Sequence, residues 1–189
     1  MPSLNLDFLR SLKDTHTKFN TFIETGTLNG GTIFALEPHF NKLYTIEVSS
    51  KYYNETKSRY KGNKINFVLG DSALIFKDLL KTIDTNAIFF LDGHWSSGDT
   101  GKGEKDCPLV EEITEINEKF RHEAIIIIDD YRLFGKSCKN FNMKEDWSDI
   151  NKETLLKILD ERITNVYHLD SECSKDDRLI IHINGINNE

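Results

Sequence analysis

Two apolar stretches, AIFFL at Ala87–Leu91 and AIIII at Ala124–Ile128, decide the fold class of this 189-residue chain. Neither stretch alternates apolar with polar residues, as a strand with one face in water would. Continuously apolar strands are buried on both faces, which is typical of a parallel sheet covered by helices on each side. Residues 108–121 lie between them and place Leu109, Ile113 and Ile116 on one helical face, so the order here is strand, helix, strand.

The rest of the chain alternates in the same way. We expect an N-terminal amphipathic helix that carries Leu4, Leu6, Phe8, Leu9 and Leu12. Further strands are expected at residues 21–25, 42–48, 65–69, 165–169 and 178–184, and further helices at residues 31–37, 50–60, 73–81 and 151–162. The last two strands flank the turn-rich segment SECSKDD, which indicates an antiparallel hairpin. The prediction is one domain over residues 1–189, a doubly wound Rossmann-like α/β sandwich with a mostly parallel seven-stranded sheet and an antiparallel C-terminal hairpin.

Composition narrows the possible partners and the compartment. The formal net charge of −7 argues against a duplex-binding protein, because such proteins usually carry a basic surface. No apolar run approaches the roughly 20 residues of a membrane span, and we recognise no signal peptide at the N-terminus. Cys107, Cys138 and Cys173 form no CxxC or zinc spacing, which favours reduced thiols and a cytoplasmic location. We expect a small-molecule or glycan substrate and a possible homo-oligomer, with neither nucleic acid nor membrane as partner.

The loop after the first expected strand reads ETGTLNGGT, from Glu24 to Thr32. Its glycines allow a ligand to approach the backbone closely, although a tight strand–helix turn has the same composition. A P-loop requires a Lys that is absent, and Leu28 replaces the second glycine of the dinucleotide pattern GxGxxG. The loop therefore suits a ligand without phosphate groups.

Acidic residues follow the second and third expected strands. Glu47 comes 21 residues after Gly26, and a carboxylate at that place favours hydrogen bonds to two ribose hydroxyls, although a solvated loop acid is the alternative. Asp71 and Ser72 follow Gly70. Asp71 has two possible roles, a hydrogen bond to an adenine amino group or the N-cap of the next helix.

The fourth and fifth strands end in LDGHW and IDDY. Adjacent parallel strands bring Asp92, Asp129 and Asp130 to one edge of the sheet, where three carboxylates repel one another unless a cation is near. Oxygen ligands favour Mg²⁺ or Mn²⁺ over zinc or copper. The alternative is that these acids cap helices or pair with Lys or Arg.

Two further side chains are candidates for chemistry. His94 lies two residues beyond Asp92 and is a candidate general base, metal ligand or ordinary loop histidine. Cys107 has no neighbouring base in the sequence, so packing is its expected role.

The motifs ETGTLNGGT, TIEV, GDS, FFLDGHW and IIIIDDY together resemble class I S-adenosylmethionine-dependent methyltransferases, over about residues 20–184. The resemblance implies an S-adenosylmethionine cofactor. The implied cofactor-binding residues are Glu24, Thr25, Gly26, Thr27, Gly30, Thr32, Glu47, Asp71, Ser72 and Asp92.

Within that class, DGxx after strand four and DDY after strand five resemble the metal-dependent macrocin-type O-methyltransferases, which act on sugar hydroxyls. This likeness implies Asp92, Asp129 and Asp130 as ligands of Mg²⁺ or Mn²⁺, with His94 as the base beside Asp92. The chain departs from that pattern in WSSGDTGKGEKDCP, a Gly-rich charged loop that we expect to close over substrate. Tyr131 and Arg132 are candidates for the acceptor pocket or for a structural role.

Three other functions stay open. A catechol or phenol O-methyltransferase would share the metal and the fold. N-methylation of nucleic acid or protein is disfavoured because [DN]PP[YF] is missing after strand four. A nicotinamide-dependent oxidoreductase is the third, but its YxxxK pair, Tyr53 and Lys57, follows the second strand, too early for a dehydrogenase.

Overall fold

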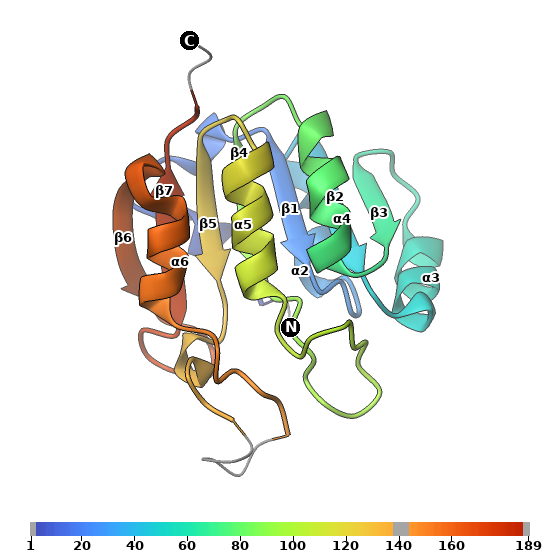
Figure 1. Ribbon diagram of the computed structural model, residues 1–189. Coiled ribbons are helices and arrows are strands. Elements are labelled where there is room, and N and C mark those ends of the chain that lie inside the picture. Colours follow the sequence, from blue (N-terminus) through green and yellow to red (C-terminus); the bar gives the residue numbers. More distant parts are fainter. Residues whose placement is uncertain (1–2, 138–143, 187–189) are drawn as a thin grey trace.

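The computed structural model describes residues 3–137 and 144–186 (Figure 1). Its centre is a seven-stranded sheet of order β3-β2-β1-β4-β5-β7-β6. Strands β1 to β5 are parallel, and β7 is antiparallel to both β5 and β6. This confirms the predicted mostly parallel sheet with its antiparallel C-terminal hairpin. The strands are β1 Thr21–Thr25, β2 Lys42–Glu47, β3 Ile65–Leu69, β4 Ala87–Leu91, β5 Ala124–Ile128, β6 Ile163–Leu169 and β7 Arg178–Ile183.

Helices cover both faces of the sheet, as the continuously apolar strands require (Figure 1). Residues of α4, α5 and α6 pack with one face, and residues of α1 and α2 pack with the other. The helices are α1 Leu6–Arg10, α2 Gly31–Leu36, α3 Ser50–Arg59, α4 Ser72–Leu79, α5 Leu109–Lys119 and α6 Lys152–Leu159. None of the helices in these described ranges has the length and apolar character to cross a bilayer.

The central strands divide their side chains between the two layers. In β4, Phe89 belongs to the core under α4 and α5, whereas Phe90 belongs to the core on the α2 side. The Phe89 ring lies edge-on to Phe120 at 5.1 Å between centroids. Fully burying one such side chain is worth about 1.5–3 kcal/mol, so these strands anchor the sheet from which the functional loops project.

Some predicted boundaries differ from the structure by one to three residues. The helix expected at residues 31–37 ends at Leu36, because Pro38 lies in a short 3₁₀ turn. The strand expected at 165–169 begins at Ile163, where a bulge shifts its register against β7. Of the cysteines, Cys107 and Cys173 are free, and Cys138 lies outside the described residues.

The register aligns the carboxyl ends of the parallel strands at one edge of the sheet, the lower edge in Figure 1. Thr25 pairs with Leu91, and Leu91 pairs with Ile128. Asp92 and Asp129 therefore leave the sheet as neighbours. The antiparallel strand β7 enters beside them, because Leu179 pairs with Ile128.

Candidate active site

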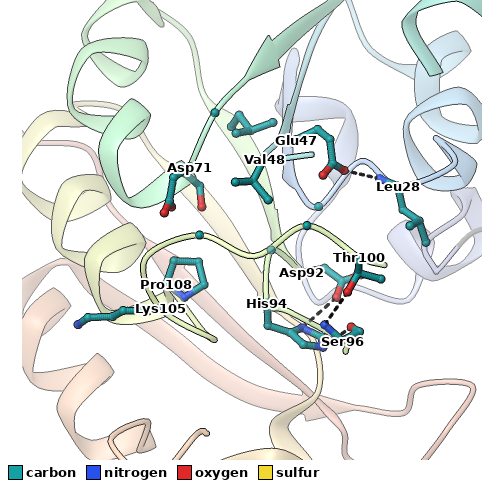
Figure 2. A pocket seen from close by; sticks show the side chains of 17 residues that line it. Leu28, Glu47, Val48, Asp71, Asp92, His94, Ser96, Thr100, Lys105 and Pro108 are labelled. Carbon is teal, nitrogen blue, oxygen red and sulfur yellow. Dashed lines mark hydrogen bonds and ion pairs between the residues drawn. The ribbon is translucent and has the colours of Figure 1, made fainter. Parts of the chain in front are cut away.

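A pocket opens at this edge, between the loops that follow β1, β2, β3 and β4 (Figure 2). Six of the residues singled out in the sequence line it, namely Gly26, Glu47, Asp71, Ser72, Asp92 and His94. Apolar contacts come from Leu28, Ile46, Val48 and Pro108. The pocket thus combines an apolar wall with a few polar groups, the usual character of a small-molecule site.

The glycine loop brings its backbone close to the end of β4. Gly26 has a φ of +83°, and a side chain there would collide with the carbonyl of Asp92. Only glycine satisfies both demands, so the loop forms one wall of the pocket without a side chain in the way. Gly26 itself lines the pocket, so this turn is part of the pocket wall.

Glu47 connects the second strand to the glycine loop. Its Oε2 accepts a hydrogen bond from the N–H of Leu28 at 2.8 Å (Figure 2). Its Oε1 accepts one from the N–H of Ser49 at 2.8 Å. The residue is 5% exposed, so the alternative of a solvated loop acid is wrong. Each carboxylate oxygen has a second lone pair that can accept from a ligand hydroxyl.

Asp71 takes the capping role that the sequence left open. Its Oδ1 accepts from the N–H of Ala73 at 3.0 Å at the start of α4. Its Oδ2 accepts from the N–H of Glu104 at 2.9 Å, which ties the loop after β4 to this wall. Asp71 still lines the pocket, so capping and ligand binding are compatible.

A second cavity lies against the glycine loop and is lined by Glu24, Thr27, Thr32 and Asp92, among others. Glu24 is 1% exposed, and burial raises the pKa of its carboxyl to about 8 despite a hydrogen bond from the Thr45 hydroxyl at 2.6 Å. The Thr32 hydroxyl accepts from the N–H of Leu4.

Thr25 and Gly30 line neither cavity. The Thr25 hydroxyl accepts from the N–H of Asp92 at 3.2 Å, and Gly30 is the N-cap of α2 with a φ of +69°. Both residues therefore shape the loops around the site.

Asp92, His94 and Asp130 form a compact group beside the main pocket. One ligand atom from each lies within 4.8 Å of the others. Nε2 of His94 is 3.2 Å from Oδ2 of Asp130, and Nδ1 is 3.5 Å from Oδ1 of Asp92. Asp130 reaches this position through a left-handed backbone, with a φ of +59°, which Asp tolerates better than most residues.

Two arginines enter the same acidic cluster. Nε of Arg178 lies 3.3 Å from Oδ1 of Asp129. Arg132 is ion-paired with both Asp130 and the buried Asp177, at 2.5 Å to Oδ2 of Asp177. The three predicted metal ligands therefore do not lie together in one group. Asp129 groups with Asp130 and Asp177, and not with Asp92. The alternative of pairing with arginine holds for Asp129 and Asp130.

Burial and the neighbouring charges shift the pKa values of Asp92 and His94. Burial, followed by the carboxylates of Asp129 and Asp130, raises the pKa of Asp92 well above its ordinary value. Burial lowers the pKa of His94, whose ring packs edge-on against Trp147 at 4.9 Å. At neutral pH the imidazole is therefore neutral and can accept a proton.

Other candidates are structural. Tyr131 packs on Phe134, and Arg132 serves the ion pairs described above, so neither lines the main pocket. Tyr53 and Lys57 hydrogen-bond to each other on the exposed side of α3. Burial raises the pKa of the Cys107 thiol, which makes it a poor nucleophile.

Sequence reasoning did not assign two parts of the site. The loop after β4 was expected to cover substrate, yet Ser96, Thr100, Gly101, Gly103 and Lys105 line the main pocket together with Glu47 and Asp71. Glu112 of α5 is a buried acid beside the pocket loops and was not singled out. A charged residue next to the apolar positions of an amphipathic helix was the available signal.

No protein-family model and no curated protein matches the sequence. Solved structures do resemble the chain in fold. A provisionally assigned methyltransferase from Streptococcus mutans, in complex with S-adenosylhomocysteine, is 19% identical with a TM-score of 0.57, over 95% of this chain and 94% of its own.

Magnesium protoporphyrin IX methyltransferase from Synechocystis, with the same molecule bound, is 13% identical with a TM-score of 0.59, over 95% of this chain and 79% of its own. The N-methyltransferase NodS from Bradyrhizobium japonicum is 14% identical with a TM-score of 0.54, over 89% of this chain and 86% of its own. The chain therefore has the Rossmann-like fold of class I S-adenosylmethionine-dependent methyltransferases.

Proposed function

We propose that the protein is an S-adenosylmethionine-dependent O-methyltransferase that uses Mg²⁺ or Mn²⁺ and acts on a hydroxyl of a sugar or glycan. One observation carries the proposal. The pocket that contains Gly26 and Glu47 adjoins the group formed by Asp92, His94 and Asp130, so a nucleoside site and an acid–base site share Asp92. Similar folds bind S-adenosylhomocysteine, the demethylated cofactor.

The residues of the main pocket fit a sulfonium nucleoside. Leu28, Ile46 and Val48 offer apolar surface to a base, and Glu47 offers carboxylate oxygens to ribose hydroxyls. The glycine loop, residues 24–32, has no lysine that could bind a phosphate, in agreement with a cofactor that has no phosphate group. S-adenosylmethionine would supply the electrophilic methyl group when bound, and Asp92 lines the pocket that would hold it.

The donor set beside the pocket also fits a hard divalent cation. Four carboxylates, those of Asp92, Asp129, Asp130 and Asp177, share the region with the guanidinium groups of Arg132 and Arg178. When all four are ionised, two negative charges remain for an ion of charge +2. The carboxylates of Asp92 and Asp130 would hold it, and when bound it would polarise an acceptor hydroxyl.

His94 is a candidate for a metal ligand or for the general base. We retain the role of general base, which the resemblance in the sequence implies. Its neutral imidazole lies 3.2 Å from Asp130, which would stabilise the imidazolium formed on proton uptake. The Ser96 hydroxyl is 2.9 Å from Nε2 and fixes the ring together with Trp147. Arg132 and Arg178 hold Asp130 and Asp129 in place by ion pairs.

Calorimetric titration tests the proposal in two stages. S-adenosylhomocysteine should bind the protein, whereas NAD⁺ should not. Mn²⁺ should then bind with a stoichiometry near one, and a panel of sugars, catechols and amines with labelled S-adenosylmethionine should give metal-dependent transfer to a sugar hydroxyl. Failure to bind S-adenosylhomocysteine rejects the methyltransferase, and full transfer in excess EDTA rejects the metal.

A further inference from the structure

Glu112 of α5 is a buried acid that the proposed chemistry leaves without a role. The residue is 1% exposed and lies beside Leu109 and Ile113, on a helix that packs against the sheet. Burying a carboxylate there costs several kcal/mol unless hydrogen bonds compensate. The groups that contact the Glu112 carboxyl therefore indicate what role it has.

Those partners belong to the loops that build the main pocket. Ser72, the first residue of α4, donates from its hydroxyl to Oε1 of Glu112 at 2.6 Å. The Thr25 side chain, at the end of β1, lowers the pKa of the same carboxylate. The Thr25 hydroxyl in turn accepts from the N–H of Asp92.

The loop after β4 is packed against the same group. A Cβ on Gly93 would lie 2.9 Å from Oγ1 of Thr25 and 3.2 Å from Oε1 of Glu112. Only a glycine allows the backbone to approach so closely. One carboxylate therefore connects the ends of β1 and β4 with the start of α4, and Ser72, Asp92 and Gly93 all line the main pocket.

We propose that Glu112 is a positioning residue for the nucleoside pocket, which holds Thr25, Ser72 and the Asp92–Gly93 backbone in the arrangement that binds the cofactor. The inference rests on the proposed function, because it assigns the main pocket to S-adenosylmethionine. Glu112 itself does not line that pocket and acts through its neighbours.

The charge of Glu112 determines the strength of these contacts. Burial raises the pKa of Glu112 to about 7, against the Ser72 and Thr25 side chains, which lower it. The ionised carboxylate accepts a charge-assisted hydrogen bond from the Ser72 hydroxyl. The protonated carboxyl still accepts through its carbonyl oxygen, but the bond is weaker because it is no longer charge-assisted, so the carboxyl holds the loops less firmly.

Other titratable groups surround Glu112. Asp71, before α4, and Glu111, on α5, raise its pKa by their charges. Cys107, His94 and Asp129 line a small cavity with it. Glu24 also titrates near pH 8. A comparison of variants at two pH values separates Glu112 from these groups, since they are the same in all proteins compared.

The experiment is calorimetric titration of S-adenosylhomocysteine into the full chain at pH 6 and pH 8. The variants are Glu112→Gln, Ser72→Ala and the control Glu115→Gln, which makes the same change one turn further along α5, outside the main pocket. We expect Glu112→Gln to weaken binding about tenfold at pH 8 and much less at pH 6, the size usual for residues that orient a binding group. Ser72→Ala should weaken it severalfold at pH 8, and Glu115→Gln should bind like the unchanged protein.

The outcomes distinguish the inference from the function on which it rests. If the unchanged protein binds but Glu112→Gln and Ser72→Ala match it at both pH values, the positioning role is wrong and the methyltransferase stands. A loss of equal size at both pH values also overturns it, because a purely structural role predicts that result. If the unchanged protein does not bind, both proposals fail. Should Glu112→Gln not fold, the Ser72→Ala result at the two pH values decides.

Discussion

The backbone N–H of Glu104 donates a hydrogen bond to Oδ2 of Asp71 at 2.9 Å. The same carboxylate is the one for which the sequence leaves two roles open, a hydrogen bond to an adenine amino group or the N-cap of α4. Gly101 and Gly103 bring the loop close enough to touch Val48 and Asp71, where any side chain would collide. The loop after β4 thus occupies one acceptor position of this oxygen, and a nucleoside amino group that approaches from the same side would compete with it.

Replacing Gly103 by Ala tests this competition. The new Cβ would collide with Oδ2 of Asp71, so the loop and the carboxylate must move apart and their hydrogen bond is lost. We expect S-adenosylhomocysteine to bind about fivefold more tightly, the factor that corresponds to one hydrogen bond of about 1 kcal/mol. Titration calorimetry measures it, with the exposed Glu104→Ala as control, which keeps the backbone donor. Weaker binding by Gly103→Ala would mean that the loop is a wall of the nucleoside site and not its competitor.

Asp92→Asn tests the metal group. The amide keeps the size of the side chain but removes a negative charge from the group with His94 and Asp130. We expect turnover to fall at least about 100-fold, as loss of a metal-polarised hydroxyl would cause, and Mn²⁺ binding to be lost. S-adenosylhomocysteine binding should change less than about threefold, since the amide keeps the size of the side chain and one acceptor oxygen. Asp99→Asn, in the same loop and paired with Lys51 at the surface, is the control. Unaltered Mn²⁺ affinity in Asp92→Asn would place the ion elsewhere.

Asp177→Asn tests the ion pairs that support the acidic cluster. Asp177 is 1% exposed and accepts from the Arg132 backbone N–H at 2.9 Å and from the Ser171 hydroxyl at 2.7 Å. Burial raises its pKa, but hydrogen bonds from Ser171 and Arg132 outweigh burial and leave the pKa below the ordinary value. Its stabilisation is therefore present above the ordinary pKa and is lost as the pH falls through the depressed one.

We expect Asp177→Asn to lower the free energy of unfolding by about 3 kcal/mol at pH 7, since it leaves Arg132 with one partner fewer. The difference from the unchanged protein should shrink below pH 4. Urea unfolding at both pH values measures it. Asp176→Asn, an exposed neighbour whose φ of +55° Asn accepts, should differ by less than about 0.5 kcal/mol.

Glu24→Gln tests the buried acid beside the glycine loop. The pKa of about 8 lies above the ordinary value, so the folded state favours the protonated form. This stabilisation is complete below the ordinary pKa of 4.5 and is lost as the pH rises through 8. The Gln amide retains an acceptor for the Thr45 hydroxyl and does not ionise.

We expect the two proteins to have similar stability at pH 5, and Glu24→Gln to be more stable at pH 9 by on the order of 3 kcal/mol. Urea unfolding curves across this range give the difference directly. The exposed Glu55→Gln on α3 should show no such divergence. Parallel pH profiles for Glu24→Gln and the unchanged protein would show that Glu24 is ionised in the folded state.

Part of this architecture could be derived without coordinates. Uninterrupted apolar runs at Ala87–Leu91 and Ala124–Ile128 require cover on both faces, because an exposed apolar face has no compensation in water. The alternation of strands and helices then leaves few topologies, and parallel strands place their following residues at one edge. For this reason the sequence alone predicts that Gly26, Glu47, Asp71 and Asp92 lie at one edge of the sheet.

Only the tertiary structure decided the pairing of charges and the place of the loop after β4. Arg178 reaches Asp129 because β7 runs antiparallel beside β5, a pairing between residues 49 positions apart. Glu112 meets Ser72 and Thr25 through the packing of α5 on the sheet. Local sequence determines periodicity and turns, since these depend on neighbouring residues. Contacts between distant segments depend on how all the layers pack at once, and periodicity carries no information about them.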